Sequence, residues 1–142
     1  MKLKHLRLLA TVFVIVLPTT LYGQQSSTVG EILDRRGAKI SGDEVRNLLS
    51  GATITGLQFN FPGTFQMTYK ESGYAEGFGS SRDVYVSGTW WVNEDGQLCT
   101  NLRNNRGTRL GGCSYYFKLN DSYFNAQSDE RSSRALERQV KR

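Results

Sequence analysis

The chain has 142 residues with two cysteines and one histidine, and its 18 Lys and Arg residues against 13 Asp and Glu residues give a net charge of +5. This length suits one domain with a modest hydrophobic core. The single histidine, His5, lies at the start, so the body of the chain lacks the residues for a Ser-His-Asp or Cys-His catalytic system and for a histidine-ligated metal site.

Residues 1–23 have the pattern of an export signal. An apolar run, residues 8–17, is followed by a small residue that suits cleavage, Gly23, and the run is preceded by Lys2, Lys4, His5 and Arg7. Ten apolar residues are too few to span a bilayer, which needs about 20. An uncleaved anchor is therefore the less favoured alternative, and we expect a periplasmic or secreted protein with no stable membrane span after cleavage.

The positive charge lies mostly at the two ends of the chain. Without residues 1–23, the chain has 15 cationic and 13 anionic side chains. Residues 130–142 contain five of these cations and two of the anions. Residues 24–129 are close to neutral, with 10 cations and 11 anions. A nucleic-acid-binding domain gathers its cations on one face, so we expect no nucleic-acid partner.

Residues 24–40 are predicted to form a flexible start and a short helix. Thr28 and Glu31 have the spacing of a capping box, which satisfies the free N–H groups of a helix start. Gly37 is the residue that we expect to stop this helix.

A second short helix is predicted after residue 40. Ser41 and Glu44 form another capping box, and Ile40 and Val45 have the spacing of a hydrophobic staple. Gly51 ends the helix, whose apolar stripe is Val45, Leu48 and Leu49. We expect this helix to cover one end of a sheet, the alternative being a helix that binds a partner or lies on a membrane.

The chain from residue 52 onwards has the period of short strands separated by glycines. Strands are predicted at 53–61, 65–70, 74–78, 83–92, 97–103, 112–119 and 122–126. The fold class is therefore mainly β: an antiparallel meander that curls into a small sheet or barrel, with two short N-terminal helices. The capped helix and the meander make up residues 41–126, and residues 127–142 are predicted to be a frayed, basic and polar tail.

The stretch Ser87 to Cys99 reads as a β-hairpin. Asp95-Gly96 favours a two-residue type I′ turn, which would place Val92 opposite Cys99. In an exported protein the two cysteines are expected to form a disulfide, Cys99–Cys113, across neighbouring strands. Side chains alternate along strands, so one apolar face would hold Val84, Val86, Trp90, Val92, Cys99, Cys113, Tyr115 and Phe117.

Two surfaces are candidates for binding. On the opposite sheet face, Tyr85, Trp91 and Tyr116 could stack on sugar rings or hold a small apolar ligand; alternatively, the two helices cover them. In the loop 103–111, Arg103, Arg106 and Arg109 could contact an anionic partner, the alternative being a solvated hairpin tip.

Nothing in the chain indicates catalysis. The carboxylates available for paired acid–base chemistry are Glu76, Asp83, Glu94, Asp95 and Asp121. Three of these fall in predicted turns, where acidic residues are common. We therefore expect no enzyme, no catalytic residue, no metal site and no cofactor.

The order of several motifs resembles a known group of proteins. LSGATITG, FQMTYKESGYAEG, SGTWWVNEDGQLC and CSYYFKL follow one another as in small exported proteobacterial proteins classed as a domain of unknown function, which share the pattern G-x-W-x-v-x-d-G-x-L-C. The resemblance covers residues 41–124 and implies a periplasmic β-domain without catalytic residues. The chain departs from the pattern at Glu71-Ser72-Gly73, where Asp-Gly is preferred.

The favoured function is a non-catalytic binding or accessory module of the bacterial envelope. Its partner would be an unknown envelope protein, a glycan or a small apolar ligand. The alternative is an inhibitor or immunity-type protein that inserts a rigid, disulfide-braced loop into a partner, and a small hydrolase is less favoured.

Overall fold

The computed structural model describes residues 26–80 and 84–142. The predicted signal peptide and Asp83 lie outside these residues. The helices are α1 (Val29–Asp34) and α2 (Gly42–Leu49). The strands are β1 (Ser26–Thr28), β2 (Ala38–Lys39), β3 (Ala52–Leu57), β4 (Thr64–Tyr69), β5 (Tyr74–Gly79), β6 (Val84–Val92), β7 (Leu98–Asn104), β8 (Arg109–Leu119), β9 (Ser122–Ala126) and β10 (Arg134–Lys141).

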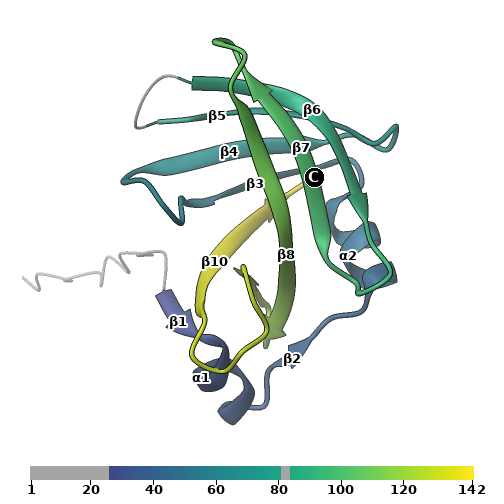
Figure 1. Ribbon diagram of the computed structural model, residues 1–142. Helices are drawn as coiled ribbons and strands as arrows, with labels where there is room; N and C mark the ends of the chain where they lie inside the picture. The colour runs from purple at the N-terminus through teal and green to yellow at the C-terminus, as the bar shows by residue number, and fades with distance from the viewer. Residues whose placement is uncertain (1–25, 81–83) are drawn as a thin grey trace, which may run out of the picture.

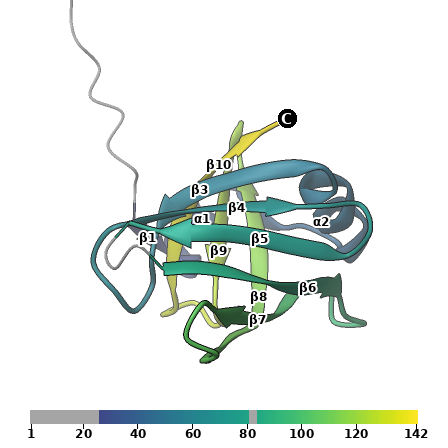
Figure 2. The ribbon, with the colours of Figure 1, turned by 90° about the horizontal axis from the view of Figure 1, so that it is seen from above.

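Strands β3 to β10 form a closed antiparallel barrel. Each pairs with the next in the chain, and β10 returns to pair with β3. Strands β3, β4 and β5 cross behind β7 and β8 at a steep angle (Figure 1), and the view from above shows β8, β9 and β10 running behind the wall formed by β3 to β6 (Figure 2). The predicted mainly β meander with two short N-terminal helices is therefore confirmed.

Both helices begin at the predicted capping boxes. The Thr28 hydroxyl accepts from the Glu31 N–H, and the Glu31 carboxylate accepts from the Thr28 N–H at 2.8 Å. Ser41 and Glu44 make the same reciprocal pair at the start of α2. The first helix ends at Asp34, before Gly37, and Arg36 takes the left-handed φ of 65° beyond its end.

Two hydrophobic clusters lie on opposite sides of the barrel wall. The larger cluster fills one end of the barrel, where α2 packs with Trp90, Tyr69 and Tyr116. The smaller one joins α1 to the outer face of β8 and β9, around Ile32 and Phe117. Neighbouring residues of β8 therefore belong to different cores, because side chains alternate along a strand. Figure 1 shows α1 at the lower end of the view, beside β1.

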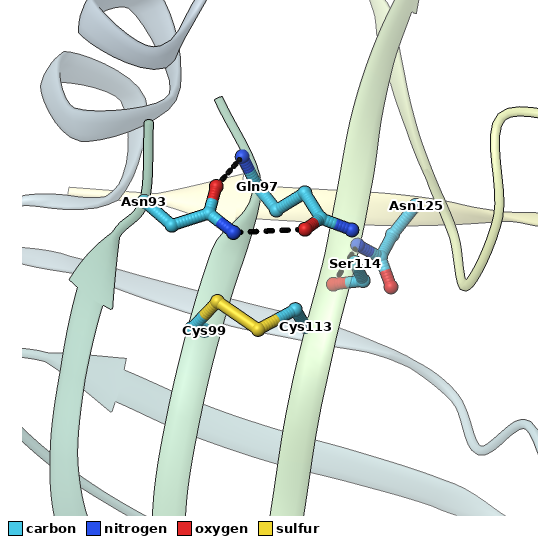
Figure 3. Close-up of a disulfide and its surroundings, with 6 residues drawn as sticks. All are labelled: Asn93, Gln97, Cys99, Cys113, Ser114 and Asn125. Carbon is cyan, nitrogen blue, oxygen red and sulfur yellow. Dashed lines mark hydrogen bonds between the residues drawn. A yellow bond between two sulfur atoms is a disulfide. The ribbon is translucent and has the colours of Figure 1, made fainter. Parts of the chain in front are cut away.

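The β6–β7 connection differs from the predicted type I′ turn. Val92 pairs with Leu98 and Trp91 with Cys99, so the register is shifted by one residue. A type I′ turn needs a positive φ at both central residues, and in the described chain Gly96 has one (φ 77°) but Asp95 does not. The Asn93 side chain instead closes a longer loop, accepting from the Gln97 N–H at 2.9 Å and donating to the Gln97 side chain (Figure 3).

This shift changes which side chains share a face. A one-residue slip moves every side chain of a strand to the other side of a sheet. The predicted apolar face is therefore wrong in composition: Cys99 and Cys113 lie with Trp91 on the outer face, whereas Leu98, Leu102 and Tyr116 face inwards with Trp90 and Val92.

The predicted disulfide is confirmed. Cys99 and Cys113 are directly opposed on β7 and β8, with Cα atoms 4.0 Å apart and a sequence separation of 14 residues. The bond ties the two strands together on their outer side (Figure 3).

The last residues are not a frayed tail. Strand β10 pairs with β1, β3 and β9 and thereby closes the barrel. Its composition favours a helix, but Leu136, Arg138 and Val140 have the alternation of a strand with one buried face. Burial of Ala135, Leu136 and Arg138 against the rest of the barrel outweighs the local preference.

Candidate ligand-binding cavity

The barrel contains a cavity of about 570 Å³ at the end away from α2. Helix α2 packs against the start of β3, the end of β6 and the start of β7, whereas the cavity is lined by the end of β3 and by the segments that join β3 to β4 and β7 to β8. Since successive strands run in opposite directions, these two groups of residues lie at opposite ends of the barrel. The apolar lining is Leu57, Phe59, Phe61, Phe65, Met67, Phe78, Val84, Val86, Leu102 and Leu110.

The other end of the barrel is closed by packed side chains. Trp90 meets Tyr69 edge to face, with ring centroids 5.6 Å apart, and its indole N–H donates to the Lys70 carbonyl at 2.8 Å. Val45 and Leu49 of α2 are fully buried in the same cluster. The floor of the cavity is therefore fixed, whereas Phe61 and Phe78 leave about half of their surface exposed, at 46% and 52%, around its mouth.

Arg138 is the buried charge in the wall of this cavity. Its side chain projects inwards from β10 and is 4% exposed. Nη1 donates to the Leu57 carbonyl at 2.8 Å and to the Glu137 carbonyl at 3.4 Å. The guanidinium carbon lies 4.9 Å from the centre of the Phe65 ring and 5.2 Å from that of Phe59. Such cation–π contacts stabilise a cation removed from water.

The glycine opposite Arg138 makes room for the guanidinium group. Gly56 pairs with Arg138 across β3 and β10. A β-carbon at position 56 would collide with Nη1 and Cδ of Arg138. The position of the Arg138 side chain therefore depends on the absence of a side chain at position 56 in the neighbouring strand.

The electrostatic surroundings of Arg138 contain no carboxylate among the described residues. Burial lowers the pKa of Arg138, while Tyr116 and Tyr69 raise it and Arg134 lowers it further. An arginine remains protonated in such a site at neutral pH. The barrel thus buries a positive charge that is balanced by carbonyl dipoles and aromatic rings alone.

Two buried tyrosines lie close enough to Arg138 to interact with its charge. Burial raises the pKa of Tyr116 to about 12 and raises that of Tyr69 further. Neither hydroxyl hydrogen-bonds to another residue in the part of the chain that the structure describes, and Tyr69 lines the cavity. Both phenols are protonated at neutral pH and can donate a hydrogen bond.

The predicted aromatic face is not one surface. Tyr85 and Trp91 lie on the outside of the barrel, 44% and 47% exposed, whereas Tyr116 points inwards and is buried. The alternative, that the helices cover these residues, holds for Tyr116, which packs in the same buried cluster as α2. It does not hold for Tyr85 and Trp91, which are exposed. Tyr85 donates to Glu76 at 2.7 Å, and Glu76 pairs with Lys70.

The three arginines of the β7–β8 hairpin lie in different places. Arg103 and Arg109 oppose each other directly on the outer face, and Arg103 also donates to the Gly107 carbonyl. Arg106 lines the mouth of the cavity. The expected anion-contact loop is therefore divided between the outer surface and the cavity entrance.

The carboxylates are spread over the surface. Glu76 is held by Lys70 and Tyr85, whose hydrogen bonds lower its pKa, and Glu94, Asp95 and Asp121 lie in turns. In residues 26–80 and 84–142 there is no cluster of three His, Cys, Asp or Glu side chains that could hold a metal ion.

Sequence reasoning did not bring together the residues that line the cavity. The sequence patterns place Arg138 in a polar tail and residues 57–61 in a strand, whereas β3 ends at Leu57 and the residues after it line the cavity. The pattern that identifies Arg138 is its place between Leu136 and Val140, at the alternate positions of a strand whose inward face is otherwise apolar.

No protein-family model, curated protein or solved structure matches this chain. Neither of the helices in the described ranges has the length and hydrophobicity to cross a membrane.

Proposed function

We propose that the protein is a non-catalytic binding module that holds a small apolar ligand inside its barrel. The observation that carries this proposal is the cavity of about 570 Å³, whose surface is mainly apolar, with polar side chains such as Asn125, Gln127 and Arg138 in its lining. Ligand sites commonly have volumes of about 300–1,000 Å³ and this kind of lining.

The architecture supports the same conclusion. An eight-stranded barrel is about wide enough for its interior either to be filled by side chains or to hold one small ligand. Here side chains and α2 fill one end of the barrel, and the cavity occupies the other end. A disulfide between β7 and β8 braces the wall next to this pocket.

We also propose that the protein acts in the periplasm or outside the cell. The Cys99–Cys113 disulfide supports an oxidising compartment. The polypeptide recovered from periplasmic or culture fractions should begin just after residue 23, and an intact N-terminus with two free thiols would contradict export.

Titration with the neutral dye N-phenyl-1-naphthylamine tests the binding function. We expect saturable binding with one site, displaced by 1-dodecanol. Thr100 lines the cavity on β7, whereas Thr89 is exposed on the outer face of β6. Thr100→Phe should abolish dye binding, and the matched change Thr89→Phe should retain it.

Both variants must first give a urea transition like that of the wild type, so that a loss of binding is not a loss of folding. Wild-type protein that binds no dye, or equal dye binding by the two folded variants, would contradict a site inside the barrel.

A further inference from the structure

We propose that the ligand is an amphipathic monoanion, an apolar chain or ring system with one carboxylate head group, and that the carboxylate pairs with Arg138 inside the barrel. This inference rests on the proposed function, because it names the chemical class of the ligand held in the same cavity.

The first argument is the missing counter-charge. A buried cation is strongly disfavoured unless it is paired and hydrogen-bonded. Arg138 is nearly fully buried, yet no Asp or Glu of residues 26–80 or 84–142 contacts its guanidinium group. A carboxylate brought by a ligand would complete this pairing in the cavity that Arg138 lines.

The second argument is the geometry of the guanidinium group. Both of its hydrogen bonds come from Nη1, which is held by the Leu57 and Glu137 carbonyls. Nε and Nη2 have no partner in the described chain. A carboxylate can accept two parallel hydrogen bonds from such a pair of nitrogens, which is the strongest form of arginine–carboxylate recognition.

The third argument is the neighbouring hydrogen-bond donor. Tyr69 lines the cavity, interacts electrostatically with Arg138 and has no hydrogen-bond partner for its hydroxyl among the described residues. Its high pKa keeps it protonated. A phenol and a guanidinium group together favour one anionic head group inside a pocket whose surface is mainly apolar.

The lining restricts the rest of the ligand. Phe65, Met67 and Leu102 line the cavity together with Arg138, and Phe61 and Phe78 are exposed around its mouth. Apart from Arg106 at the mouth, the described lining holds no other charged side chain than Arg138, so a second negative charge inside the cavity would lack a charged partner, which disfavours dianions. Arg106 at the mouth adds a positive charge on the entry path.

Calorimetric titration of the full-length protein with dodecanoate and with 1-dodecanol tests this inference. The two probes share a chain and differ in the charge of the head group. We expect the wild type to bind dodecanoate at least about tenfold more tightly, as expected for hydrogen bonds between charged groups.

Arg138→Met should remove this preference, so that the folded variant binds dodecanoate and 1-dodecanol with affinities within about twofold of each other. The matched control is Arg109→Met on the outer face, which should retain the preference. If Arg138→Met does not fold, Arg138→Lys serves in its place and should weaken the preference, because a lysine offers no planar pair of donors.

Equal wild-type affinities for the two probes, or a preference that survives in folded Arg138→Met, would overturn the carboxylate assignment while the barrel remained a binding site. Wild-type protein that binds neither probe would overturn the proposed function itself, and this inference with it.

Discussion

At the scale of single residues, Arg138 and Gly56 form a matched pair in the barrel wall. The guanidinium group occupies the space that any side chain at position 56 would fill. The guanidinium group makes cation–π contacts with two aromatic rings, Phe59 and Phe65. The pair therefore explains how a strand that closes the barrel can carry a charge on its inner face.

Gly56→Ala should destabilise the protein by about 1–3 kcal/mol, because the new methyl group collides with the Arg138 side chain and forces it to move. Urea unfolding measures this loss. The double variant Gly56→Ala/Arg138→Met should lose much less from the alanine, since a flexible methionine can move aside. Strictly additive losses in the double variant would show that the two residues do not compete for the same space.

The buried phenol of Tyr116 makes the free energy of unfolding depend on pH in the alkaline range. Burial raises its pKa from 10.0 to about 12, so above pH 10 the unfolded chain loses this proton before the folded one does. The stabilising contribution is thus complete below pH 10 and is lost as the pH rises towards 12, amounting to about 2 kcal/mol.

Urea unfolding at about pH 9 and about pH 11.5 should show a smaller loss of stability for Tyr116→Phe than for the wild type. A wild-type stability that does not change over this range, or an identical loss in the variant, would place the Tyr116 hydroxyl in contact with water.

At the scale of elements, local patterns predicted helix starts and most strands well. The capping boxes at Thr28 and Ser41 depend on residues three positions apart, and alternation within β3 to β9 is visible in each strand. The β6–β7 register could not be predicted from Asp95-Gly96, because the Asn93 side chain closes a longer loop. The predicted register put Tyr116 and Trp91 on the same face. The one-residue shift instead places Tyr116 inside the barrel and Trp91 outside it.

The Cys99–Cys113 disulfide should stabilise the barrel without taking part in binding. Its loop of 14 residues corresponds to about 3 kcal/mol if the entropy of the unfolded chain dominates. Cys99→Ser/Cys113→Ser should lower the free energy of unfolding by this amount and leave dye affinity unchanged where the variant is folded. A folded double variant that no longer binds would assign the outer face of β7 and β8 to the site.

Strand β10 should be essential for folding, although its polar composition predicts a frayed tail. Leu136 is fully buried and Leu136→Ala should cost about 2–5 kcal/mol, whereas the exposed Gln139→Ala should cost less than about 0.5 kcal/mol. Thermal unfolding of the two variants distinguishes them. Equal and small effects would restore the interpretation of residues 127–142 as a dispensable tail.

At the scale of the whole molecule, the barrel has two unlike ends. Helix α2 and the Trp90–Tyr69 pair fill one end, and the other opens between Phe61 and Phe78. The cavity could not be predicted from the sequence, because it depends on closure between β3 and β10. The contact from Arg138 to Leu57 joins residues 81 positions apart, and no local pattern records such a pairing.

The position of a bound probe tests the central claim most directly. Nuclear Overhauser contacts between the chain protons of dodecanoate and the protein would locate it. We predict contacts to the methyl groups of Met67 and Leu102 and, from the protons next to the carboxylate, to the Arg138 side chain. Contacts to Trp91 and Tyr85 on the outer face, with none to these inward-facing side chains, would contradict a ligand site inside the barrel.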